Sequence, residues 1–152
     1  MTEDSLNIDD LRGKIGVEWE PEVYEVEKGM LQRFVQAIDD PNPLWRNEEY
    51  ASKSRYGGIV APPTFVLTIG FERIEQQIFA SIPTGSVLHG ETALEHYQPI
   101  RPGDVITATT KITNIRERQG EKGQTVFMTF EITYINQRQE LVAKCRQMIV
   151  SY

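Results

Sequence analysis

The chain has 152 residues, of which 39% are hydrophobic and 25% charged, so it lacks the signature of disorder and predicts one compact domain over residues 1–152. The formal net charge of -6 argues against nucleic acid as the main partner, because binding to phosphates needs a concentrated positive surface. One cysteine and two histidines cannot form an internal disulfide and give little basis for a metal site, so we expect no metal and no cofactor. Because the sequence contains no apolar run of about 18 residues and begins with an acidic segment, we expect a cytoplasmic protein without membrane contact.

The first half of the chain has mainly helical periodicity. A short strand is expected at residues 23–26, followed by a helix that carries Met30, Leu31, Phe34, Val35 and Ile38 on one face. A second helix is expected from the N-cap Asn47 to about Lys53. The third and most apolar helix is expected over residues 64–80, directly after two prolines, with Phe65, Ile69, Ile74 and Ile78 among its apolar residues.

From about residue 85 the hydrophobic period changes from helical to two. Strands are expected at residues 86–98, 104–116, 124–136 and 140–151, with turns at residues 101–104, 118–123 and 136–139. An antiparallel sheet of about five strands needs cover for its apolar face, and the helix at 64–80 is the one element hydrophobic enough to provide it. We therefore predict an α+β fold in which the sheet wraps around a central helix.

Four spaced motifs stand out along the chain. They are Asp40-x-Asn42-Pro43-Leu44, then Tyr50-Ala51, then residues 56–63 (YGGIVAPP), and later Pro102-Gly103-Asp104. Together they resemble the MaoC-like hydratase and dehydratase branch of the hot dog fold, and the Ala-Pro-Pro ending is closest to its FAS1-like, N-terminal type. The resemblance covers residues 11–150. It implies that the substrate is an acyl thioester of coenzyme A or acyl carrier protein.

Two positions depart from the catalytic pattern that this resemblance implies. Catalytic members read D-x-N-P-L-H, so Asp40 matches the family's catalytic Asp while Trp45 stands at the position of its His. An indole N–H only donates and does not titrate in water, so Trp45 cannot act as the general acid or base. Pro63 matches a glycine whose backbone N–H polarises the thioester carbonyl, and proline has no N–H to offer.

For most polar residues near these motifs, a structural and a chemical interpretation both remain open. Asp40 either closes an Asx-turn or retains a chemical role. His89 and His96 are either strand histidines or a replacement base, and Cys145 is read as a core residue. The predicted substrate-binding residues are Trp45, Asn42, Pro63, Phe65, Arg46 and Arg55, with Leu67 as a looser candidate and the two arginines as possible contacts for a coenzyme A phosphate.

Three functional hypotheses follow from the resemblance. The first is a non-catalytic, acyl-chain-accommodating subunit of a heteromeric (R)-specific enoyl-CoA hydratase or 3-hydroxyacyl-thioester dehydratase, paired with a MaoC-like subunit that carries D-x-N-P-L-H. The second is a self-sufficient homodimeric hydratase with a relocated base. The third is a non-enzymatic acyl-CoA-binding hot dog protein. Fatty acid, polyketide and steroid side-chain routes all use such domains, and the sequence does not choose between them.

Overall fold

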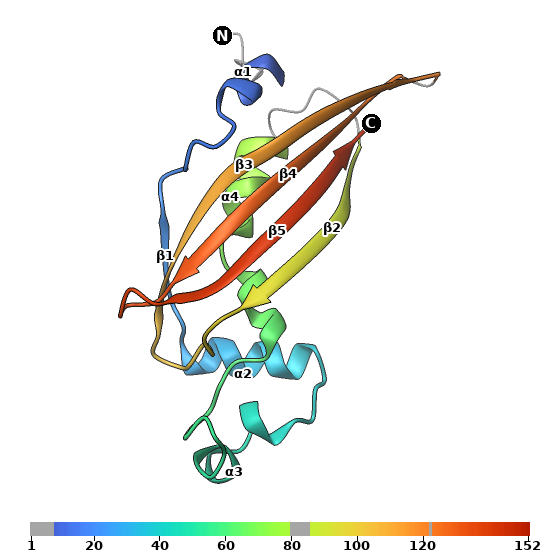
Figure 1. The fold of residues 1–152 in the computed structure, drawn as a ribbon. Coiled ribbons are helices and arrows are strands. Elements are labelled where there is room, and N and C mark those ends of the chain that lie inside the picture. Colours follow the sequence, from blue (N-terminus) through green and yellow to red (C-terminus); the bar gives the residue numbers. More distant parts are fainter. Residues whose placement is uncertain (1–7, 80–85, 122) are drawn as a thin grey trace.

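The computed structural model describes residues 8–79, 86–121 and 123–152, which form a curved antiparallel sheet and a set of short helices (Figure 1). The strands are β1 (Glu22–Glu25), β2 (Val87–His96), β3 (Val105–Gly120), β4 (Gly123–Ile135) and β5 (Leu141–Ser151). Their spatial order is β1-β3-β4-β5-β2, with every neighbouring pair antiparallel. The predicted five-stranded α+β architecture is therefore confirmed, with β1 and β2 at the two edges of the sheet.

The helices lie behind the sheet and near both of its ends (Figure 1). They are α1 (Ile8–Gly13), α2 (Lys28–Ala37), α3 (Glu48–Ser52) and α4 (Phe71–Ile74), with 3-10 turns at Pro43–Trp45 and Pro63–Thr68 and a π-helical turn at Glu75–Phe79. In Figure 1, α4 lies behind the sheet, α2 and α3 lie past one of its ends, and α1 lies at the opposite end. The predicted N-cap is also confirmed, since Asn47 Oδ1 accepts a hydrogen bond from the Tyr50 N–H at 2.9 Å. None of the described helices is long and apolar enough to cross a membrane.

The central helical segment is not the continuous helix predicted over residues 64–80. It begins where expected, at Pro63, but it is interrupted at Ile69 and Gly70. Ile69 is extended, and Gly70 has a φ of 83°, a left-handed conformation that side chains disfavour. A Cβ at Gly70 would also lie 3.3 Å from the Cβ of Ala108, so the break allows the backbone to approach the sheet closely. The apolar periodicity of the sequence continues through the break and therefore conceals it.

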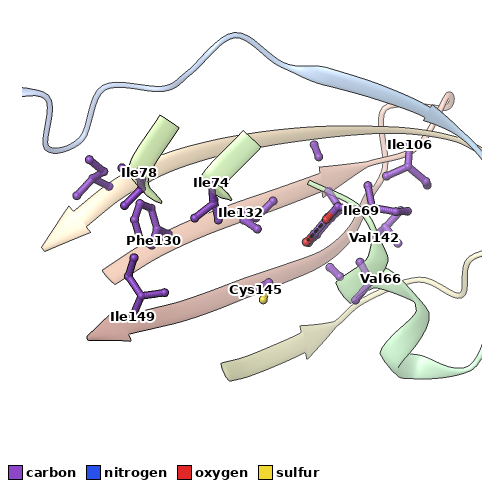
Figure 2. Close-up of a cluster of buried hydrophobic side chains, with 14 of the residues drawn as sticks. Val66, Ile69, Ile74, Ile78, Ile106, Phe130, Ile132, Val142, Cys145 and Ile149 are labelled. Atoms are coloured by element: carbon purple, nitrogen blue, oxygen red, sulfur yellow. Dashed lines mark hydrogen bonds between the residues drawn. The ribbon is translucent and has the colours of Figure 1, made fainter. Parts of the chain in front are cut away.

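The core lies between this broken helical segment and the concave face of the sheet. Figure 2 shows Ile69, Ile74 and Ile78 facing Phe130 and Ile132, and all five residues are 1% exposed or less. From Thr125 to its end, strand β4 alternates half-buried and buried residues, as the period of two predicted. Cys145 is fully buried in this core, and burial raises the pKa of its thiol. Its interpretation as a core residue is confirmed.

The β3–β4 hairpin extends further than the sequence predicted. Residues 118–123 were expected to form a turn, but Arg118 pairs with Thr125, Gln119 with Gln124, and Gly120 with Gly123. This prediction was wrong because the end of the hairpin projects beyond the core. Its strand residues are exposed there and carry no alternation of apolar and polar side chains that a sequence pattern could reveal.

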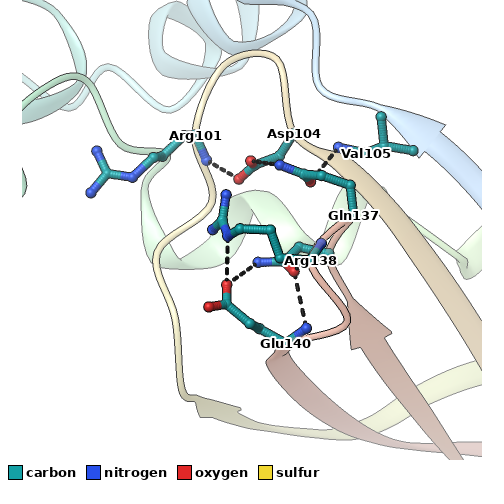
Figure 3. A network of polar contacts seen from close by, with 7 residues as sticks. Arg101, Asp104, Val105, Gln137, Arg138 and Glu140 are labelled. Carbon is teal, nitrogen blue, oxygen red and sulfur yellow. Dashed lines mark hydrogen bonds and ion pairs between the residues drawn. The ribbon is translucent and has the colours of Figure 1, made fainter.

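A polar network fixes the loop between β2 and β3, and Figure 3 shows it. The buried Asp104 accepts hydrogen bonds from the Arg101 N–H at 2.8 Å and from Gln137 Nε2 at 2.9 Å. Gln137 Oε1 in turn accepts the Val105 N–H at 3.0 Å. The loop therefore has a defined conformation, and residues 97–100 at its start line the pocket described next.

Candidate functional site

The Asp40-x-Asn42-Pro43-Leu44 motif forms a rigid turn directly after α2. Asp40 Oδ1 accepts the Asn42 N–H at 3.0 Å, and Asn42 Oδ1 accepts the Leu44 N–H at 3.0 Å. Asp39 has a φ of 51°, and its left-handed conformation lets the chain reverse direction at the end of the helix. Two side-chain caps and two prolines therefore hold the backbone that carries Trp45.

A pocket of about 320 Å³ lies beside this turn. Three stretches of chain build it: the 3-10 turn that ends at Trp45, residues 55–63, and residues 96–100 at the end of β2. A backbone hydrogen bond of 2.8 Å from the Ala61 N–H to the Ile100 carbonyl joins the last two stretches. The lining residues are Trp45, Arg55, Tyr56, Val60, Ala61, Pro62, Pro63, His96, Tyr97, Gln98, Pro99 and Ile100. Its volume lies at the lower end of the range of roughly 300–1,000 Å³ for small-molecule sites.

The two positions that depart from the catalytic motif face this same pocket. Trp45 and Pro63 both line it, although they are 18 residues apart in the sequence. The Trp45 Nε1 atom is buried and has no hydrogen-bond partner among the described residues. Asp40 does not line the pocket, and its carboxylate is engaged in the turn. At the place where the family pattern would supply a base and an oxyanion donor, this chain offers an indole and a proline ring.

Polar groups stand around the apolar part of the pocket. The Arg55 guanidinium donates to the Tyr56 hydroxyl at 2.6 Å and lies 4.8 Å from the centre of its ring. The Tyr97 hydroxyl donates to a carboxylate oxygen of Glu95 at 2.6 Å, and this hydrogen bond raises the pKa of Tyr97. Arg55 and Tyr97 are both exposed, so the polar groups meet solvent while Val60 and Pro62 are buried. The arrangement suits a ligand with an apolar part and a polar part.

The two histidines have different surroundings. His96 is the last residue of β2 and lines the pocket with Trp45, whereas His89 does not line it. The His89 ring instead lies with Nε2 2.8 Å from the Thr92 hydroxyl on the exposed edge strand. In the sequence, both histidines are far from the Asp40 turn. His96 and Tyr97 come close to it because the chain folds residues 96–100 back against residues 60–63.

The remaining predicted binding residues lie elsewhere. Phe65 is fully buried and packs edge-on against Phe34, with ring centres 5.4 Å apart. Asn42 caps the 3-10 turn, and Leu67 packs against the core. Arg46 donates to the Val35 carbonyl at 3.3 Å. Of the six predicted binding residues, three line the pocket: Trp45, Pro63 and Arg55.

A second pocket, of about 460 Å³, lies between α2 and the turn. It is lined by Lys28, Leu31, Gln32, Val35, Gln36, Trp45, Arg46, Glu48 and Ile59. Trp45 is the one described residue that lines both this pocket and the first. Within the described ranges, no group of three or more His, Cys, Asp or Glu side chains is placed to hold a metal ion.

The sheet topology, the central helical segment and the motif turn define a MaoC-like hot dog protein. The chain belongs to the family described as the FAS1-like dehydratase domain region, whose profile matches residues 13–145. It is 35% identical over 105 residues to a UPF0336 protein of Thermobifida fusca, covering 67% of this chain and 69% of the relative.

Two solved structures show the same fold. The 3R-hydroxyacyl-ACP dehydratase HadBC complex of Mycobacterium tuberculosis is 24% identical with a TM-score of 0.76, over 90% of this chain and 96% of that one. A MaoC-like dehydratase of Rhodospirillum rubrum is 23% identical with a TM-score of 0.69, over 91% and 92%.

Proposed function

We propose that this chain is the non-catalytic, acyl-accommodating subunit of a heteromeric enoyl-thioester hydratase or 3-hydroxyacyl-thioester dehydratase. The observation that carries the proposal is that Trp45 and Pro63 line one pocket at the two positions where the chemistry needs a base and an N–H donor. Hydration of an enoyl thioester needs a group that activates water and a donor that stabilises the enolate-like oxygen. Neither an indole nor a proline supplies these functions.

The remaining acid of the motif does not compensate for these losses. Asp40 has a carboxylate oxygen that accepts the Asn42 N–H, and the side chain lies outside the pocket. Its role is to shape the turn that presents Trp45. A subunit of this kind binds the acyl part of a thioester and leaves the addition or removal of water to a partner.

The pocket supports an acyl thioester of coenzyme A or acyl carrier protein as the ligand. Its buried wall, made by Val60, Pro62 and Ile100, suits an alkyl or ring system. Arg55 stands at the exposed side, where a guanidinium can contact a phosphate of the carrier. Arg46 is turned to the Val35 carbonyl and borders the second pocket, so Arg55 is the better placed of the two predicted arginines.

The partner in this proposal is a second MaoC-like hot dog chain with an intact D-x-N-P-L-H motif. The HadBC structure, which has the same fold, is a complex of a 3R-hydroxyacyl-ACP dehydratase. The edge strand β2 offers a surface for such assembly because its outer side has no strand beside it in the described sheet.

The direct test is to measure hydration of crotonyl-CoA by three samples: this chain alone, the His-containing partner alone, and the two after co-purification. We expect activity in the mixture and none above background in this chain alone. A partner in which the motif His is replaced by Ala is the control, and it should abolish activity of the mixture without preventing assembly. Turnover by the homogeneous chain would overturn the proposal.

One observation favours a second candidate function, a self-sufficient hydratase with a relocated base. His96 lines the same pocket as Trp45 and Pro63, and imidazole is the side chain best suited to proton transfer near neutral pH. In that case the homogeneous protein hydrates crotonyl-CoA, and His96→Ala removes the activity. His89→Ala is the matched control, because His89 lies on the same strand but does not line the pocket. Equal activity of both variants would rule out His96 as the base, and binding without turnover in every sample would indicate an acyl-CoA-binding protein.

A further inference from the structure

Trp45 lines two pockets. Its side chain borders the pocket of about 320 Å³ on the side of Pro63 and the pocket of about 460 Å³ on the side of α2. Trp45 is thus the one described residue that the linings of the two spaces share. If that side chain moved, each pocket could open into the other, and the combined space would fall well within the range of roughly 300–1,000 Å³ for ligand sites.

The backbone and the side chain of Trp45 are held in different ways. The backbone belongs to a 3-10 turn fixed by the Asn42 cap and by a 2.9 Å hydrogen bond from the Asn47 N–H to the Pro43 carbonyl. The indole has no such tether, because its Nε1 is buried without a partner among the described residues. Packing alone therefore fixes the ring, and a buried donor without an acceptor is unfavourable. A rotation of the ring about its side-chain bonds would break neither of these hydrogen bonds of the turn.

The pocket beside α2 offers the indole a better polar environment. Gln32 and Gln36 line it, and each carries an amide oxygen that can accept an N–H hydrogen bond. Leu31, Val35 and Ile59 line the same space and suit the carbon atoms of an aromatic ring. In its present position Trp45 lines the first pocket together with the apolar residues Val60 and Pro62, and an apolar ligand can replace the apolar surface that the ring provides there.

We infer that Trp45 is a movable partition that sets the length of acyl group this chain accommodates. This inference rests on the proposed function and names its specificity-determining residue. A short acyl group occupies the pocket beside Pro63 with the indole in place. A longer one displaces the indole toward Gln32 and Gln36 and continues along the space that the ring vacates. Each additional buried methylene then adds about fourfold in affinity until the space is filled.

Two variants test the partition by binding. Affinities of butyryl-, octanoyl- and palmitoyl-CoA are measured by calorimetry, for the chain alone and for its complex with the partner. Trp45→Ala removes the ring, and we expect it to strengthen binding of the longest acyl group relative to butyryl-CoA by about tenfold or more. Trp45→Phe keeps a smaller ring without the N–H, and we expect an intermediate preference. If neither variant changes the ratio of palmitoyl-CoA affinity to butyryl-CoA affinity, the inference is wrong.

Fluorescence gives a second measurement that does not depend on the Ala variant folding. The chain has two tryptophans, so Trp19→Phe leaves Trp45 as the single indole. Octanoyl- or palmitoyl-CoA should then change the emission maximum, whereas butyryl-CoA should leave it unchanged. The matched control is Trp45→Phe, which leaves Trp19, packed edge-on at 6.0 Å against Phe130 and lining neither pocket. That variant should show no shift with any acyl group.

The outcomes separate this inference from the function on which it rests. If calorimetry shows binding but Trp45 emission and chain-length preference do not respond, the partition is wrong and the acyl-binding role stands. If no acyl-CoA binds, either to the chain or to the complex, acyl-CoA is not the ligand of this chain and the partition fails with it.

Discussion

The carboxylate of Asp40 accepts the backbone N–H of Asn42 at 3.0 Å, and this Asx-turn directs the motif acid into the loop instead of the neighbouring pocket. The same carboxylate that the family pattern marks as catalytic therefore has a structural partner in this chain. The turn it closes presents Trp45, so the geometry of the site depends on Asp40 even though the side chain does not reach the ligand space.

Substitutions at Asp40 should separate structure from chemistry. Asp40→Asn keeps an oxygen that can accept the Asn42 N–H, so we expect the active complex to retain its kcat and its assembly. Asp40→Ala loses the acceptor and should lower the free energy of unfolding by about 1 kcal/mol, as measured by urea denaturation. A fall in kcat of about a hundredfold or more for Asp40→Asn, with assembly intact, would make Asp40 catalytic and end the companion-subunit proposal.

Restoring the motif histidine should not restore an enzyme. Trp45→His supplies a titratable base, but the pocket still lacks the N–H donor at Pro63, so we expect the homogeneous chain to stay nearly inactive toward enoyl-CoA. Trp45→His combined with Pro63→Gly has the better chance, because both groups act on one transition state. Pro63→Gly alone is the control for loosening of the helix entrance. The measurement is the steady-state hydration rate of the two single variants and of the double variant. Full activity of Trp45→His alone would contradict the coupling of the two positions.

The hydroxyl of Tyr134 is expected to stabilise the break in the central helical segment. It donates to the Ile69 carbonyl at 3.0 Å, and both residues are buried. Tyr134→Phe leaves that carbonyl without its partner in the core, which should cost about 1–3 kcal/mol of unfolding free energy. Tyr50→Phe, on an exposed residue of α3, is the matched control and should change stability by less than about 0.5 kcal/mol. Equal urea midpoints for the two variants would remove Tyr134 from this role.

Stability should decline in alkaline solution. Burial, followed by the hydrogen bond to Glu22, raises the pKa of Tyr24 to about 12, and burial also raises the pKa of Tyr134. Above about pH 10 the unfolded chain releases these protons while the folded chain keeps them, so the folded state loses stability as pH rises, for Tyr24 up to about pH 12. Urea unfolding between about pH 8 and pH 11 checks this. Tyr24→Phe is expected to reduce the decrease of the unfolding free energy with pH over this range. A rise in stability over that range would contradict the assignment.

The edge strand β2 predicts that the chain is not a stable monomer. Light scattering at micromolar concentration should show a dimer, or a monomer that assembles when the partner is added. In an antiparallel pair of two β2 strands, Thr92 near the strand centre approaches its own copy, so Thr92→Lys brings two like charges together and should weaken a homodimer. Thr109→Lys, placed on a strand away from this edge, is the control. A clean monomer with and without the partner would contradict the prediction.

Local patterns in the sequence were enough to predict most of the sheet and two of the helices. The alternation around Phe130 and Ile132 marks β4 because a strand buries every second side chain. Asn47 marks the start of α3 because its side chain caps a free N–H. The spacing of Asp40, Asn42 and Pro43 predicted the motif turn. The same motif showed that Trp45 stands where the catalytic pattern has a histidine. Helix α1 was not predicted at all.

Long-range contacts decided the rest. The break at Gly70 allows the close approach of the backbone to Ala108 and is accompanied by a hydrogen bond from the hydroxyl of Tyr134, which lies 65 residues beyond Ile69. The pocket exists because residues 96–100 fold against residues 60–63, which makes His96 and Trp45 line the same space. Hydrophobic periodicity indicates which face of a segment is buried. It carries no information on which distant segment packs against that face. The burial of the Trp45 Nε1 atom and the place of Trp45 in the linings of two pockets are therefore properties of the folded chain.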